Sequence, residues 1–308
     1  MTDAQPGSVL VYDRIGANKR ATALLTFVFV ALTTGLAAVI LLALGAPIGV
    51  LGAVGIGLIL YAIFSYYAAS GAVLSISGAH EVTKQEEREF VRRVENLAIG
   101  AGLPPPRTWV IEDSAPNAFA TGRDPRHAHI AVTRGLLNKL EPSELEAVLA
   151  HEMSHIGNYD IRLMTMTTVL VGLVALLADF FLRWTWYGAG RRPSNRDRGG
   201  GAAALAILPV ALLGAILAPL VAQIIRFAIS RRREFLADAG GALLCRNPGA
   251  LADALEKIAA DPDPLEAANK ATAHLYITNP LKEHASALNN LFDTHPPIEE
   301  RIRILRSL

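Results

Sequence analysis

Residues 141–160, EPSELEAVLAHEMSHIGNYD, are the stretch around which the rest of the chain can be arranged. Ser143 precedes a run of helix-forming residues, and it can cap a helix in which Glu146 completes a capping box. Apolar residues then recur with the period of a helix. They are Leu145, Val148, Leu149 and Met153. The stretch therefore predicts an amphipathic helix whose apolar face packs on a core.

Two histidines of this helix form a candidate metal site. His151 and His155 are four residues apart, so their imidazoles lie on one face about one turn apart. A single Zn²⁺ can bind both, with each nitrogen at about 2.0–2.1 Å. Glu152 lies beside the first histidine, where its carboxylate can take a proton from a water held by the metal. These residues predict one zinc ion per chain with Glu152 as general base. The alternative is two solvated histidines on an amphipathic helix.

A catalytic zinc needs a third protein ligand and an open fourth position. Residues 230–238, SRRREFLAD, place Glu234 and Asp238 one helical turn apart. Glu234 could bind the metal while Asp238 accepts the N–H of His151 and fixes its tautomer. The alternative is an exposed acidic pair that balances three arginines. Rival candidates for the third ligand are His80, His127, His129 and His295.

The composition places part of the chain in lipid. Of the 308 residues, 52% are hydrophobic and only 19% are charged, whereas about a quarter of the residues of a soluble domain are charged. Residues 21–70 carry no Asp, Glu, Lys or Arg and are interrupted by Gly45-Ala46-Pro47. They predict two membrane spans, about 21–45 and 48–70, each long enough to cross a bilayer. The apolar region of a cleaved signal peptide would be shorter.

A second pair of spans is predicted at 163–182, where Asp179 is the only charge, and at 202–225. Basic residues near span ends indicate the cytoplasmic side. Those at positions 14, 19, 20, 226 and 231–233 place the amino terminus and the end of the last span in the cytoplasm. The arginine-rich loop at 183–201 disagrees. Either the rule is overridden there, or this second pair enters the bilayer only partly.

The remaining segments predict a small α+β domain. Thr83 to Glu86 reads as a capping box that opens a helix to about Gly100. Short strands are predicted at 108–111, 118–121 and 129–133, separated by turn-rich segments. Further helices are predicted at 230–244, 251–259 and 296–308.

Charge and cysteine content argue against a nucleic-acid partner and against an intramolecular disulfide. The net charge is +1, so no basic field indicates a nucleic-acid partner. Cys245 is the only cysteine, and it cannot close an intramolecular disulfide.

Four motifs together resemble the M48 family of integral-membrane metallopeptidases, and within it the HtpX-type heat-shock proteases rather than the CAAX prenyl peptidases. HEMSHIGNYD at 151–160 is similar to the family's HExxHxxNxD, and SRRREFLAD at 230–238 to its SRxxExxAD. NAFATG at 117–122 and THPP at 294–297 are similar to two further motifs of that family. The motifs occur in the family's order along most of the chain.

The resemblance implies roles for individual residues. Glu234 becomes the third zinc ligand, and an edge strand holds the substrate backbone by strand addition. The residues of that strand are Asn117, Ala118, Phe119 and Ala120. Asn158 and Asp160 either end the helix or support the site by hydrogen bonds. His295 either stabilises the oxyanion of the tetrahedral intermediate or shapes a turn before a helix.

The expected fold is α+β: a mainly helical, zincin-like (gluzincin) domain with a small sheet, plus about four transmembrane helices in two hairpins. We expect a membrane hairpin at 1–78, catalytic segments at 79–162 and 228–308, and a second hairpin at 163–227. The resemblance implies a multi-pass protein of the cell (inner) membrane with its active site facing the cytoplasm. It would cleave unfolded, misfolded or damaged membrane proteins in quality control and stress. The alternatives are a processing peptidase with a dedicated substrate and an inactive scaffold or holdase.

Overall fold

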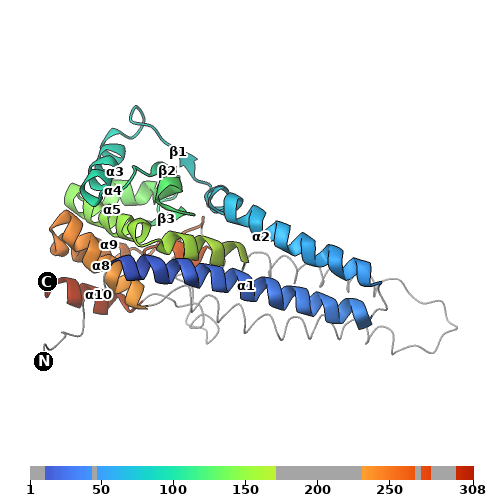
Figure 1. Cartoon of the computed structure of the whole chain (residues 1–308). Helices are drawn as coiled ribbons and strands as arrows, with labels where there is room; N and C mark the ends of the chain where they lie inside the picture. Colours follow the sequence, from blue (N-terminus) through green and yellow to red (C-terminus); the bar gives the residue numbers. More distant parts are fainter. Residues whose placement is uncertain (1–10, 44–46, 171–230, 268–271, 279–295) are drawn as a thin grey trace, which may run out of the picture.

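The computed structural model describes residues 11–43, 47–170, 231–267, 272–278 and 296–308. It is mostly helical and contains one small mixed sheet. Figure 1 shows a mixed domain of helices and strands at one end, from which two long helices extend side by side. The predicted mixture of helices with a small sheet is confirmed.

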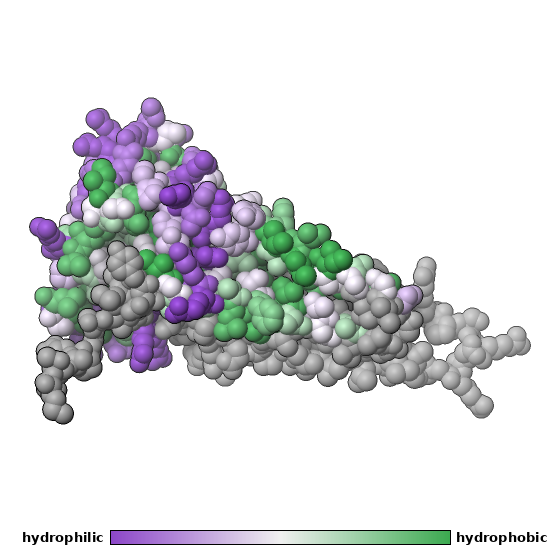
Figure 2. Space-filling view, in the orientation of Figure 1, coloured by the Kyte–Doolittle hydropathy of each residue, from purple (hydrophilic) through white to green (hydrophobic). Residues whose placement is uncertain are grey.

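The two long helices are α1 (Val11–Ala43) and α2 (Ile48–Ile76). Both are long and apolar enough to cross a membrane, and four-fifths or more of each apolar window is not buried by the rest of the protein. Figure 2 shows an apolar surface along these helices and a polar surface on the domain. Exposed apolar surface of this extent fits a lipid environment. The large exposed side chains include Leu24, Phe27, Ile56, Ile59, Leu60, Ile63, Phe64 and Tyr67.

The two helices of the first predicted hairpin are therefore present. Of the second, only residues 163–170 are described, and they are helical. Residues 171–230, which include Asp179, the arginine-rich loop and the span at 202–225, lie outside the described part of the chain.

The sheet contains four strands in the order β1-β2-β4-β3. They are β1 (His80–Glu81), β2 (Arg107–Ile111), β3 (Ala118–Gly122) and β4 (Ala128–Thr133). β2 pairs parallel with β4, whereas β1–β2 and β3–β4 are antiparallel. The three predicted strands are confirmed, with β3 at an edge. The two-residue β1 was not predicted.

The helices of the domain lie beside the sheet and pack on one another (Figure 1). Their bounds are α3 (Arg88–Ala101), α4 (Arg134–Lys139), α5 (Pro142–Gly157), α8 (Arg231–Cys245), α9 (Pro248–Ala260) and α10 (Ile298–Leu305). Two short 3₁₀ helices are η1 (Pro125–His127) and η2 (Ala273–Leu275). The helices predicted in these regions are present, and α9 begins earlier than expected.

Two predicted helix starts are wrong. α5 begins at Pro142, with Glu141 as N-cap, and Glu144 accepts a hydrogen bond from the backbone N–H of Glu141 at 2.8 Å. Proline suits the first helical position because its missing N–H needs no partner there, so Ser143 lies inside the helix. The glutamate of the Thr83–Glu86 pair does accept a hydrogen bond from the Thr83 backbone N–H, at 2.8 Å. That pair closes a turn, and α3 begins only at Arg88.

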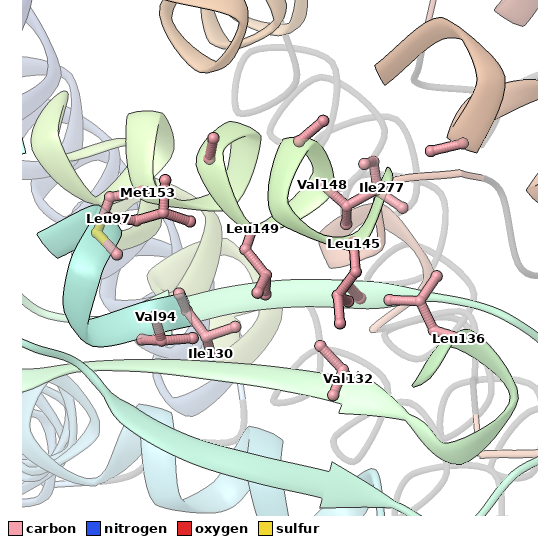
Figure 3. Close-up of a cluster of buried hydrophobic side chains, with 14 of the residues drawn as sticks. Val94, Leu97, Ile130, Val132, Leu136, Leu145, Val148, Leu149, Met153 and Ile277 are labelled. Carbon is pink, nitrogen blue, oxygen red and sulfur yellow. The ribbon is translucent and has the colours of Figure 1, made fainter. Parts of the chain in front are cut away.

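The core lies between α5 and the sheet. Figure 3 shows side chains of α5 pointing at Ile130 and Val132 of β4, with side chains of α3 beside them. The predicted stripe of α5 is buried at every position. Because strand residues alternate between faces, Ala131 faces the opposite side, where it packs with Phe119 and the end of α2. This packing fixes α5, and with it the candidate metal ligands.

Candidate metal centre

The two helices α5 and α8 bring the three expected zinc ligands together. His151, His155 and Glu234 are all buried, and one ligand atom of each lies within 4.8 Å of the others. The two histidine Nε2 atoms are 3.2 Å apart. Carboxylate oxygens of Glu234 lie 3.9 Å from Nε2 of His151 and 3.6 Å from Nε2 of His155. Tetrahedral zinc with bonds of about 2.0–2.1 Å would place its ligand atoms roughly 3.3 Å apart. The donor set and its spacing fit zinc.

Two glycines allow α8 to approach α5 this closely. A Cβ on Gly241 would lie 2.8 Å from the backbone Cα and N of His151. A Cβ on Gly240 would lie 2.4 Å from Ser154 Oγ. The absence of these side chains lets the backbones meet where Glu234 must reach the histidines.

Each histidine has a carboxylate behind it. Nδ1 of His151 lies 2.9 Å from Oδ1 of Asp238, and Nδ1 of His155 lies 3.0 Å from Oδ2 of Asp160. Carboxylates in this position orient a ligating imidazole and fix its tautomer, so that Nε2 is presented to a metal. Asp238 lies at the distance expected for that role, and Asp160 hydrogen-bonds to the second histidine.

Asn158 also ends α5 as its C-cap residue. The next residue, Tyr159, has a φ of 61°, and a helix resumes at Asp160. This left-handed residue breaks the helix and turns the chain back, so that the Asp160 carboxylate comes to lie beside His155. In this turn Asn158 ends the helix, and Asp160 hydrogen-bonds to His155.

The site is electrostatically suited to a cation. Four buried carboxylates, Glu152, Asp160, Glu234 and Asp238, share it with one buried guanidinium, Arg301. Burial lowers the pKa of His155, but its hydrogen bond to Asp160 and the charge of Glu234 outweigh burial and raise that pKa to about 9. Surroundings that stabilise a positive charge on a buried ring also favour a divalent cation there.

Glu152 has the protonation behaviour expected of a general base. Burial raises the pKa of its carboxyl group to about 7, and Glu234 acts in the same direction. The backbone N–H of Ala120 in β3 lies near the carboxylate and acts in the opposite direction, lowering the pKa. A base with a pKa near neutrality can both accept and return a proton.

The edge strand β3 runs beside Glu152. All five of its residues are buried. The Ala118 carbonyl accepts a hydrogen bond from the backbone N–H of Ile277 at 3.0 Å, and Asn117 Nδ2 donates to the carbonyl of Thr278 at 3.3 Å. Phe119 contacts Tyr276 edge to face at 5.1 Å. Residues 276–278 thus lie along the first half of β3, whereas Ala120 lies in its second half, near Glu152.

Three of the rival ligands lie elsewhere. His80 is 3.7 Å from Glu112, His127 pairs with Asp124, and His129 accepts a hydrogen bond from the Trp109 indole. Within the described part of the chain, the only candidate metal group is His151, His155 and Glu234. His295 lies outside the described residues.

Sequence reasoning missed two residues that complete the site. The Arg301 guanidinium donates to both oxygens of Asp238, and the Asn18 amide donates to Asp160. Arg301 could have been noticed, because it shares the apolar face of its helix with Ile298, Ile302 and Leu305. Nothing near Asn18 in the sequence indicates its partner.

Comparisons with known proteins identify a family to which the sequence is similar. Residues 84–308 match the model described as Peptidase family M48. A "Protease HtpX homolog" from Dictyoglomus turgidum is 44% identical over 302 residues, covering 96% of this chain and 94% of that protein. One of the same name from Thermoanaerobacter pseudethanolicus is 46% identical over 253 residues, covering 82% of each. The crystal structure of S. mikatae Ste24p matches with a TM-score of 0.47 at 20% identity, over 81% of this chain and 57% of that one.

Proposed function

This chain belongs to peptidase family M48 and is a membrane zinc metalloprotease, and we propose that it is an endopeptidase that cleaves misfolded or damaged membrane proteins, with Glu152 as general base. The observation that carries the proposal is the meeting of His151, His155 and Glu234 at one buried point. We assign these three side chains as the zinc ligands, with Asp238 and Asp160 orienting the two imidazoles.

Zinc bound there would lower the pKa of water and polarise the carbonyl of the scissile bond. Glu152 accepts the proton of the attacking water and later donates it to the leaving amine. Its pKa near 7 suits both steps. Its burial keeps competing bulk water away from the carboxylate.

The substrate class follows from the edge strand. A peptide that adds to β3 is held mainly by backbone hydrogen bonds, which carry little sequence preference. Because Ala118 already accepts from Ile277, we place the substrate along the half of the strand that contains Ala120, beside Glu152. An extended segment of an unfolded protein can take this position, whereas a folded domain cannot. We therefore propose a quality-control and stress role.

We place the active site on the cytoplasmic side. Asn18 and Lys19, at the start of the first apolar segment, contact the turn that follows α5. The catalytic domain therefore shares a side with the amino terminus, which the basic residues Arg14, Lys19 and Arg20 assign to the cytoplasm. We also propose that residues 163–227 form a second membrane hairpin, because they contain two apolar segments, and two crossings would return the chain to the side on which Glu234 meets the histidines.

The test is cleavage of casein by purified protein in detergent. Glu152→Gln should retain its zinc and lose activity by about 10²–10⁴-fold, the usual contribution of a general base. Glu146→Gln changes an exposed glutamate of the same helix and should leave cleavage unchanged. Equal cleavage by wild type and Glu152→Gln would refute the assignment of Glu152. A zinc-loaded wild type without activity would indicate a scaffold instead.

A further inference from the structure

Asn18 connects the first membrane helix to the candidate metal centre. Its side-chain amide is buried and donates two hydrogen bonds, one to the carbonyl of Asn158 and one to Oδ1 of Asp160, both at 2.8 Å. These acceptors lie on either side of Tyr159, the left-handed residue of the turn.

The neighbouring residue of α1 contacts the third member of the same turn. Lys19 Nζ lies over the Tyr159 ring, 4.2 Å from its centroid. Two consecutive residues of α1 therefore contact Asn158, Tyr159 and Asp160 together. A residue with positive φ is uncommon outside glycine and persists where surrounding contacts stabilise it.

The hydrogen bonds continue from Asn18 to the metal ligand. Asp160 accepts from Asn18 through Oδ1, and its other oxygen, Oδ2, lies 3.0 Å from Nδ1 of His155. The amide donor stabilises the ionised carboxylate and fixes its plane, so that the second oxygen faces the imidazole. Groups that hydrogen-bond directly to a metal ligand, as Asp160 does, typically change metal affinity by about 10–100-fold. Because Asn18 is one bond further from the ligand, we expect its effect at the lower end of that range.

We propose that Asn18 is a positioning residue that sets the affinity of the site for zinc by holding the Asp160 carboxylate against His155. The membrane helix α1 thereby forms part of the support of the metal centre, in addition to anchoring it. The inference rests on the proposed zinc ligands, and its substrate-independent readout is the affinity of the protein for zinc.

The experiment measures zinc affinity of the full-length chain in detergent, by competition with a chelator of known affinity. Asn18→Ala removes both donors, and Asn18→Leu does so while filling the buried space. Both should bind zinc about tenfold more weakly. Thr22→Ala is the matched control, because Thr22 is also buried one turn further along α1 and its hydroxyl donates to the Asn18 backbone carbonyl. It should bind zinc like the wild type.

A double-mutant cycle separates positioning from general stability. If Asn18 acts through Asp160, then Asn18→Ala should weaken zinc binding in the wild type but add nothing in an Asp160→Ala background. Unchanged affinity in both Asn18 variants, or an equal loss in the two backgrounds, would overturn the inference. Wild-type protein without stoichiometric zinc would instead refute the proposed function.

Discussion

Arg301 donates two parallel hydrogen bonds to Asp238, from Nε to Oδ2 at 2.8 Å and from Nη2 to Oδ1 at 2.7 Å. Its third nitrogen, Nη1, donates to the carbonyl of Ile277 at 2.8 Å. Burial raises the pKa of Asp238, but the guanidinium outweighs burial and lowers that pKa to about 2. The ionised Asp238 faces His151, so Arg301 joins the metal centre to the segment that lies along β3.

Replacing Arg301 should be costly because it leaves a buried carboxylate without its counter-charge. We expect Arg301→Ala to lower the free energy of unfolding by about 3–5 kcal/mol. Arg301→Lys keeps the charge but cannot form the two parallel hydrogen bonds, so it should lower the free energy of unfolding by less. Denaturant unfolding of the detergent-solubilised protein measures both. Arg306→Ala is the control, because its ion pairs with Asp253 and Glu256 are solvent-exposed, and a loss comparable to that of Arg301→Ala would contradict the argument.

Gly241 gives a second prediction, on helix packing. A methyl group there would overlap the His151 backbone at 2.8 Å, so Gly241→Ala must push α8 away from α5. Overpacking of this kind costs about 1–3 kcal/mol. Because α8 carries Glu234, zinc affinity should fall together with stability. Gly249→Ala, whose Cβ meets its nearest neighbour at 3.6 Å, should affect neither, and full zinc affinity in Gly241→Ala would show that the close approach is not required.

The ligand assignment predicts metal content directly. Purified wild type should contain about one zinc per chain, and His151→Ala or Glu234→Ala should lose it, because two protein ligands rarely suffice for a catalytic zinc site. His127→Ala, at an exposed histidine that pairs with Asp124, should keep its zinc. Elemental analysis after dialysis measures the zinc content of each protein. A Glu234→Ala variant that retains one zinc per chain would point to a different third ligand.

Much of this site could be predicted because its parts lie on short periodic segments. His151, Glu152 and His155 share one helix, and Glu234 and Asp238 share another, so spacing alone assigns each pair to one face. What spacing could not supply is the contact between the two helices. Gly240 and Gly241 weaken a helix when considered by propensity alone, and only packing shows why they are needed.

The missed features depend on distant contacts or very short elements. Asn18 and Asp160 are 142 positions apart, and no local pattern relates them. β1 consists of two exposed residues, too few for alternation to be recognised. The predicted start of α5 is wrong because serine is a preferred N-cap residue, whereas Pro142, which suits the first helical position, begins this helix.

The last prediction concerns acid stability and lies away from the metal centre. The Trp109 indole N–H donates to Nδ1 of His129 at 3.1 Å, which requires that nitrogen to be unprotonated. Burial lowers the pKa of His129 to about 4, and the nearby charge of Arg107 acts in the same direction. The unfolded chain takes up this proton near its ordinary pKa of about 6.5. Between these values a fall in pH therefore favours the unfolded state.

Between pH 7 and pH 5 the free energy of unfolding should therefore fall by about 2 kcal/mol. His129→Asn keeps an acceptor at the δ position and cannot be protonated, so its unfolding temperature should fall less than that of the wild type between pH 7 and pH 5. His80→Asn, at an exposed histidine of β1, should fall as the wild type does. Thermal unfolding followed by tryptophan fluorescence measures all three proteins. Identical shifts in wild type and His129→Asn would show that protonation of His129 does not cause the loss of stability in acid.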